Sequence, residues 1–168
     1  MSRPPTCPDW FERESPAQLP YVVSGLASVT RYIYKHAKTY IPTYGDLKEW
    51  HRMVFENVVP KYYYAGSFRS EDPDRPCLAV EVEVPPNPGA RFAEVPMLMA
   101  EFSGVLASFV DKTDRFIKSN PTPTDRARAA IQLAAFSAGR IIQIHPFING
   151  NGRISRLIAN YFLHRYGY

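Results

Sequence analysis

The sequence predicts a mainly α-helical domain that carries a single β-hairpin. Three observations support this fold class. Apolar residues recur at helical spacing through most of the chain. Strand-like alternation is confined to one stretch, residues 78–84, and a turn rich in proline follows it. Hydrophobic residues make up 45% of 168 residues, which suits one domain with its own core.

The first helix is expected at residues 24–36, after an irregular N-terminal arm. The prolines of this arm are Pro4, Pro5, Pro8 and Pro16. A second helix begins after Thr43, which has the spacing of a capping box with Asp46, and Pro60 ends its pattern. Its apolar positions are Leu47, Trp50, Val54 and Phe55.

The middle of the chain changes to strand periodicity. Leu78–Val84 alternates apolar residues with Glu81 and Glu83, which indicates a half-buried strand. A turn at residues 85–89 would lead into a second, short strand at Arg91–Glu94. An isolated hairpin with an open edge either varies freely on the surface or binds a partner, and the alternation alone leaves both interpretations open.

Three further helices complete the predicted bundle. One begins near Pro96, and its apolar positions are Leu98, Phe102, Val105 and Phe109. A long alanine-rich helix follows, capped by Thr124. Its expected inner face is Ile131, Ala134, Ala135, Ala138, Ile141 and Ile142. The last helix begins near Gly152 and ends at Gly167, with Ile154, Leu157, Ile158, Tyr161 and Phe162 at helical intervals.

Composition narrows the possible partners and compartment. The net charge is only +4 and no basic tract is present, so we expect no nucleic-acid partner. No apolar run has the length of a membrane span or the form of a Sec-type signal, so we expect no membrane partner either. Cys7 and Cys77 lack metal-ligand spacing, which predicts two incidental thiols in a reducing compartment. The expected protein is soluble, either cytoplasmic or delivered as an effector.

The segment HPFINGNGRISR, His145–Arg156, connects the two last helices. Gly150 and Gly152 allow positive φ angles, so successive amides can form an anion-binding nest at the start of the last helix. Arg153 and Arg156 are three residues apart and can reach the same anion with guanidinium groups that match phosphate oxygens. Asn160 lies one turn further along the same face.

Other residues of this segment add chemistry to the anion site. A neutral His145 can take a proton from a hydroxyl group. Phe147 can anchor the turn in the core, and the side-chain oxygen of Asn149 can join a hard cation such as Mg²⁺. Each feature alone is common in structural turns, but a base, a phosphate cradle and a metal position together indicate phosphoryl or nucleotidyl transfer.

This segment resembles the signature HPFx[D/E]GNGRxxR of the Fic (Fic/Doc) family. The stretch WHRMVFENVVPKYYYAGSFR, Trp50–Arg69, is similar to the family's segment LHxxLFxxxYxWAGxxR. The predicted hairpin with the following VPMLM resembles the family's flap, and RLIANYFLHRYGY resembles the helix after the signature. The resemblance covers residues 43–168, which would form the Fic core, with residues 1–42 as an arm and a first helix packed on it.

The resemblance implies transfer of AMP from ATP, with Mg²⁺, to a Ser, Thr or Tyr hydroxyl of a target protein. His145 would be the general base, and Arg153 and Arg156 would neutralise charge on the β- and γ-phosphates. The flap at Leu78–Val84 would hold the target segment as an added strand. The residues implied in nucleotide binding are Phe147, Gly150, Asn151, Gly152, Arg153, Arg156 and Asn160, with Asn149 at the metal position.

Asn149 departs from the family pattern, because a carboxylate usually occupies that position. The lost charge predicts weaker attraction of Mg²⁺ and keeps two alternatives open. One is transfer of UMP, GMP or phosphocholine through the same cradle. The other is a catalytically silent module that binds nucleotide or peptide. Relatives that phosphorylate their targets carry Lys in place of the second glycine, so Gly152 argues against that branch.

An inhibitory motif common in relatives, [S/T]xxxE[G/N], does not occur before the signature, although its glutamate usually pairs with the second arginine. We therefore expect inhibition from a separate antitoxin-like protein, from sequence beyond Tyr168, or by another route. The chain ends where relatives commonly continue with a further helix, which predicts a C-terminal truncation that removes part of the adenine pocket.

Overall fold

The structure is a computed structural model that describes residues 6–10, 14–84 and 87–168. Its α-helices are α1 (Leu19–His36), α2 (Tyr44–Phe55), α3 (Val95–Lys118), α4 (Pro123–Ile144) and α5 (Asn151–Arg165). Two 3₁₀ turns, η1 (Tyr62–Tyr64) and η2 (Pro76–Leu78), lie between α2 and a small hairpin. The hairpin strands are β1 (Glu83–Val84) and β2 (Asn87–Pro88). The prediction of a mainly helical fold with one hairpin is confirmed.

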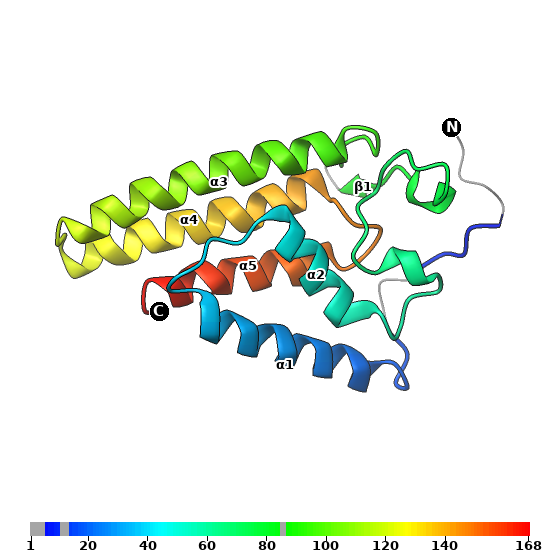
Figure 1. Cartoon of the computed structure of the whole chain (residues 1–168), viewed down its shortest axis with the longest axis horizontal. Helices are drawn as coiled ribbons and strands as arrows, with labels where there is room; N and C mark the ends of the chain where they lie inside the picture. Colours follow the sequence, from blue (N-terminus) through cyan, green and yellow to red (C-terminus); the bar gives the residue numbers. More distant parts are fainter. Residues whose placement is uncertain (1–5, 11–13, 85–86) are drawn as a thin grey trace.

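The helices form two antiparallel pairs with α5 between them (Figure 1). α3 and α4 make one pair, and α1 and α2 make the other. α5 packs against α4 on one side and α1 on the other. The turn between α4 and α5 lies at the same end of the molecule as the hairpin, where the described N-terminal residues also run (Figure 1).

The first helix packs closely on the second. α1 begins at Leu19, five residues before the predicted start, and buries Val22, Val29 and Ile33. A Cβ atom at Gly25 would lie 2.4 Å from the carbonyl oxygen of Met53, so only glycine allows the two backbones to approach this closely. α1 therefore lies against α2, and it also contacts α5.

Two helix starts depend on threonine caps. The predicted capping box at α2 is confirmed, since Thr43 Oγ1 accepts the Asp46 amide and the Asp46 carboxylate accepts the Thr43 amide. The predicted cap of α4 at Thr124 is wrong. Thr122 caps the helix by accepting the Asp125 amide, and Pro123 takes the first helical position, where its missing N–H costs no hydrogen bond.

The predicted inner faces of α3 and α4 are partly wrong. Ile131 is 57% exposed and Val105 is 54% exposed, although both were expected in the core. The buried residues of α4 are Ala130, Leu133, Ala134, Ser137, Ile141 and Ile144. Their spacing is helical, but the face is rotated from the predicted one. The buried face is determined by contacts with both α3 and α5. The spacing of the alanines alone could not predict which face this would be.

The hairpin is shorter than predicted. Only Glu83 and Val84 of the expected strand 78–84 pair with β2, in the register Glu83↔Pro88 and Val84↔Asn87. Residues 92–94 form a turn, so the predicted strand at Arg91–Glu94 is wrong, and Pro85 and Pro86 lie outside the described residues. The carbonyls of Val80 and Ala90 instead accept hydrogen bonds from a buried arginine, which replaces strand pairing there.

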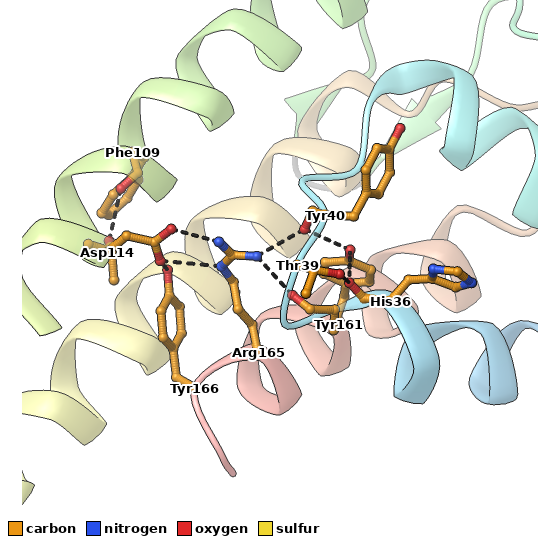
Figure 2. Close-up of polar contacts among 10 residues, drawn as sticks. His36, Thr39, Tyr40, Phe109, Asp114, Tyr161, Arg165 and Tyr166 are labelled. Atoms are coloured by element: carbon orange, nitrogen blue, oxygen red, sulfur yellow. Dashed lines mark hydrogen bonds and ion pairs between the residues drawn. The ribbon is translucent and has the colours of Figure 1, made fainter. Parts of the chain in front are cut away.

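A polar cluster ties the C-terminal end of α5 to two other helices (Figure 2). Arg165 pairs with Asp114 of α3 at 2.6 Å and donates to the carbonyls of Ala37 and Tyr40 just after α1. Burial alone would raise the pKa of Asp114, but hydrogen bonds from Arg165 and Tyr166 lower it below its usual range. This cluster holds the C-terminal end of α5 against α3 and the segment after α1.

Cys7 and Cys77 form a disulfide with a Cα–Cα separation of 5.4 Å. The prediction of two incidental thiols is therefore wrong, and the inference of a reducing compartment loses its basis. A separation of 70 residues gave no local signal of this pairing. Within the described residues, no helix combines the length and the apolar character that crossing a membrane requires.

Candidate active site

A pocket of about 300 Å³ opens at the turn between α4 and α5. It is lined by Trp10, His145, Ile148, Asn149, Gly150, Asn151, Gly152, Arg153 and Arg156. The structure thus gathers the predicted base, the predicted metal position and both predicted arginines around one space. Asn160 is exposed on α5 and does not line it.

His145 occupies an unusual backbone conformation. It ends α4 with φ 53° and ψ 58°, in the left-handed region that residues with a side chain seldom adopt, and its N–H donates to Ile141. Such a conformation costs about 1–3 kcal/mol and persists only where the surroundings enforce it. Pro146 follows directly, so the chain leaves the helix sharply, and His145 lines the pocket.

Gly150 is required by both space and conformation. Its φ is +81°, and a Cβ atom there would lie 2.4 Å from the ring of Phe55. The prediction of a positive φ at Gly152 is wrong, because Gly152 is already helical. Intrahelical bonding in α5 begins when the Arg153 amide donates to Gly150, so the amides of Asn151 and Gly152 lie at the helix N-terminus, where anions are favoured.

Two of the predicted nucleotide-binding side chains brace the turn from inside. Asn151 is buried, and its amide group accepts from the Phe147 N–H and donates to the Phe147 carbonyl, both at 2.9 Å. Phe147 is fully buried and does not line the pocket. Its ring stacks on His51 with centroids 3.8 Å apart, in agreement with the expected role as an anchor.

His51 supports the turn and was not identified from the sequence. Its Nδ1 accepts the Gly66 amide at 2.9 Å, so the ring proton is on Nε2, which donates to the Asn149 carbonyl at 2.9 Å. Burial lowers the pKa of His51 to about 3, although the hydrogen bond to Asn149 opposes the shift, so the ring is neutral at pH 7. Two signals were available: a polar residue inside the buried stripe of α2, and the fixed histidine of the family segment LHxxLF at this position.

Arg69 joins the turn to the hairpin. Its buried guanidinium donates to the carbonyls of Ile144 and His145 at the end of α4, and to those of Val80 and Ala90 on either side of the hairpin, at 2.8–3.1 Å. Burial lowers the pKa of Arg69 to about 10, while Glu81 nearby raises it, so the group stays charged at pH 7. This arginine is the last fixed letter of the family segment that Trp50–Arg69 resembles, but that resemblance gave it no role.

The returning arm of the hairpin passes directly beside the predicted base. A Cβ atom at Gly89 would lie 3.4 Å from the Cβ of His145, and the Gly89 amide donates to the Val82 carbonyl. The β2 side of the hairpin therefore lies beside the histidine.

A carboxylate from the N-terminal region forms an ion pair with Arg153, the first arginine of the motif. Both guanidinium nitrogens of Arg153 pair with the carboxylate of Glu14, with Nη2 2.6 Å from Oε2. The Glu14 side chain is only 6% exposed. The inhibitory pattern [S/T]xxxE[G/N] could not identify it, because Trp10 precedes Glu14 by four residues and Ser15 follows it.

The residues of the pocket offer little to a metal ion by themselves. Asn149 lines the pocket, and its side-chain oxygen accepts the Gly150 amide at 2.5 Å. Within the described part of the chain, no group of three or more His, Cys, Asp or Glu side chains could hold a metal. A divalent ion would fit here only if phosphate and water oxygens supplied most of its ligands, as Mg²⁺ often requires.

Comparison with known proteins identifies close similarities. A model described as "Fic/DOC family" matches residues 41–163. The chain is 34% identical over 126 residues to "Protein adenylyltransferase Fic" of Drosophila yakuba, and 33% identical to the protein of that name in Culex quinquefasciatus. Each alignment covers 75% of this chain and 20% of the relative, so the chain spans about a fifth of the relatives' length.

A solved structure shows the same fold. It is a Fic domain containing signaling protein from Bacteroides thetaiotaomicron VPI-5482, with a TM-score of 0.66 and 25% sequence identity. The match covers 95% of this chain and 53% of that chain.

Proposed function

Because this chain belongs to the Fic/DOC family, we propose that it transfers AMP from ATP to a Ser, Thr or Tyr hydroxyl of a target protein. The relatives named protein adenylyltransferases support this activity. The observation that carries the proposal is the pocket that His145 lines together with the N-terminus of α5, Arg153 and Arg156.

The nucleotide phosphates would bind at the N-terminus of α5. The amides of Asn151 and Gly152 and the helix dipole favour negative charge there. Arg156 folds toward Gly152, since a Cβ atom on that glycine would lie 3.5 Å from Nη1. Arg153 is positioned for the same phosphates, but Glu14 must first leave it.

His145 would act as the general base. As the target hydroxyl oxygen attacks the α-phosphorus, the imidazole takes its proton, and the bond from the α-phosphorus to the bridging oxygen breaks. Pyrophosphate leaves with its charge held by the two arginines. Arg69 holds the backbone carbonyl of His145 at 2.8 Å, so the base is presented in a fixed position.

The target segment would add to the hairpin as a further strand. Val84 pairs with Asn87 on one edge of β1, and we propose that the target occupies the other edge along Leu78–Val84. Arg69 supports a link between this segment and the base, because its guanidinium holds the carbonyls of both Val80 and His145.

When bound, Mg²⁺ would neutralise charge on the phosphates of ATP. Asn149 would contribute a single neutral oxygen, so the ion would depend mainly on the nucleotide. This weak metal position favours a second candidate, a module that binds nucleotide without turnover.

We predict that Asn149→Asp lowers the Mg²⁺ concentration needed for half-maximal AMP transfer by about tenfold, because a full negative charge replaces a neutral amide. Titration of Mg²⁺ against transfer rate measures this, and calorimetry measures ATP affinity with and without the metal. Asn120→Asp is the matched control, since Asn120 is exposed between α3 and α4 and does not line the pocket. An equal shift in both variants would show a general charge effect and contradict a metal position at Asn149.

The decisive experiment for the function is a comparison of labelled donors. Radiolabelled ATP should label candidate protein targets, whereas His145→Ala should label none. Labelling from UTP, GTP or CDP-choline in place of ATP would establish UMP, GMP or phosphocholine transfer. ATP binding without any labelled product would establish the silent module.

Regulation and compartment are further parts of the proposal. A separate antitoxin-like protein could supply a carboxylate to Arg156, which is exposed, in addition to the one that Glu14 supplies to Arg153. A cytoplasmic location or delivery as an effector stays a prediction. Of these two, delivery agrees better with the Cys7–Cys77 disulfide, which favours exposure of the chain to an oxidising environment.

A further inference from the structure

We propose that His51 is a positioning residue for the reaction, and that it acts by fixing the backbone of Asn149. This inference rests on the proposed function. His51 does not line the pocket, so it acts through its neighbours. One ring nitrogen is held by the Gly66 amide, the other holds the Asn149 carbonyl, and Phe147 stacks on the ring face.

These contacts connect His51, which belongs to α2, to the turn that carries the anion site. Asn149 is the predicted metal position, and Gly150, the next residue, would place a Cβ atom 3.2 Å from His51 Nε2. A shift of the imidazole would therefore move the metal position and the start of α5 together. Residues that orient a metal ligand from behind typically contribute a factor of 10–100 to metal affinity or activity.

Two substitutions separate positioning from packing. His51→Phe keeps the aromatic stack but removes both hydrogen bonds. His51→Gln can accept from Gly66 and donate to Asn149, so it should restore function. We expect His51→Phe to raise the Mg²⁺ concentration for half-maximal transfer about tenfold and to reduce the gain in ATP affinity that Mg²⁺ gives, while His51→Gln stays close to wild type. Ser137→Ala, which removes a buried hydrogen bond within α4, is the stability control.

Wild-type Mg²⁺ dependence in His51→Phe, or failure of His51→Gln to restore it, would overturn the inference. If His51→Phe does not fold, the tautomer of the wild-type imidazole tests the inference instead. Nitrogen NMR should show the proton on Nε2, and a proton on Nδ1 would exclude the donated bond to Asn149. If the wild-type protein does not bind ATP at all, that result contradicts the proposed function and not this inference.

A second inference comes from an independent observation, the attachment of the N-terminal strap, which we define as the described residues 6–10 and 14. The strap is fixed at several places along its length. Cys7 is bonded to Cys77 in η2, and the Pro8 carbonyl accepts the Tyr64 hydroxyl at 3.1 Å. Trp10 packs edge-on against Phe55 and lines the pocket, and Glu14 pairs with Arg153.

The disulfide limits how far Glu14 can move from Arg153. An ion pair near the surface contributes little when its partners diffuse freely. Cys7 lies only seven residues before Glu14, so anchoring it to the folded chain keeps the carboxylate at a high effective concentration beside the arginine. Arg153 is still 24% exposed, so a phosphate can compete for it.

We infer that the Cys7–Cys77 disulfide is a redox latch that holds Glu14 on Arg153 and so opposes binding of polyphosphate. Reduction by a dithiol breaks the Sγ–Sγ bond with two electrons and two protons, and yields two thiols while the dithiol becomes a disulfide. The released strap then frees Arg153 for phosphate. This inference adds regulation to the proposed active site and rests on that function.

The test measures binding of ATP and of inorganic triphosphate to the full chain by calorimetry, before and after treatment with dithiothreitol. We expect reduction to raise both affinities about fivefold, and Cys7→Ser with Cys77→Ser to match the reduced protein. Oxidised Glu14→Gln should show the same gain, and reduction should add nothing to it. Glu101→Gln, an exposed change on α3, is the control.

Equal affinities in the oxidised and reduced wild type would overturn the latch. So would a reduction effect that persists in Glu14→Gln, because the carboxylate would then not be the blocking group. Redox-dependent binding of triphosphate without any binding of ATP would support the latch and contradict the proposed nucleotide.

Discussion

Replacement of His145 by Asn or Ala should abolish labelling of protein targets while the domain remains folded. Loss of a general base lowers the rate by about 10²–10⁴. Two backbone hydrogen bonds of this residue, to Ile141 and from Arg69, do not depend on the imidazole. Asn is the better variant, because it tolerates the left-handed conformation at φ 53° more readily than Ala does.

Three measurements are needed together for this result. Transfer from radiolabelled ATP reports the chemistry, calorimetry reports nucleotide affinity, and thermal unfolding reports the fold. Unchanged affinity and unfolding temperature with no labelled product are the expected pattern. Labelling by His145→Asn at the wild-type rate would remove His145 as the base.

Arg69→Met should destabilise the protein by about 3–5 kcal/mol, the largest loss of stability that we expect from a single polar change. The substitution leaves the buried carbonyl of Ile144 and the half-buried carbonyls of Val80, Ala90 and His145 without their donor. Arg69→Lys should recover only part of the loss, since one ammonium cannot reproduce the planar set of donors. Denaturant unfolding measures both values.

The control for Arg69 is Arg52→Met on α2. Arg52 pairs with Glu49 and Glu56, but it is about half exposed, so its removal should cost no more than about 1 kcal/mol. If the two arginine variants lose similar free energy of unfolding, Arg69 does not have the structural role that its contacts indicate. Hydrogen exchange of the hairpin amides, which should increase only in Arg69→Met, locates the effect.

Local patterns predicted the fold class and several helix boundaries. The capping box at Thr43 and the buried stripe of α5 depend on residues a few positions apart, so periodicity and capping rules identify them. The buried face of α4 was misplaced because two neighbouring helices select it. The hairpin was overextended because alternation does not reveal that Arg69 takes up the carbonyls of Val80 and Ala90.

The candidate site was likewise predictable in part, where its residues are close together in the sequence. The motif predicted that His145, Asn149, Arg153 and Arg156 share one pocket, and they do, although their roles stay predictions. The contacts that control the site were not predictable, because they join distant parts of the chain. Glu14 and Arg153 are 139 residues apart, and His51 and Asn149 are 98 residues apart. A linear pattern carries no distance information on that scale.

Arg69 also has a consequence for target selection. One rigid guanidinium holds both the segments that would grip a target and the carbonyl of the residue that would deprotonate it. An ill-fitting peptide that strains the hairpin would therefore disturb the imidazole as well. Discrimination between targets should then appear in kcat more than in KM, so that poor targets are bound yet seldom modified.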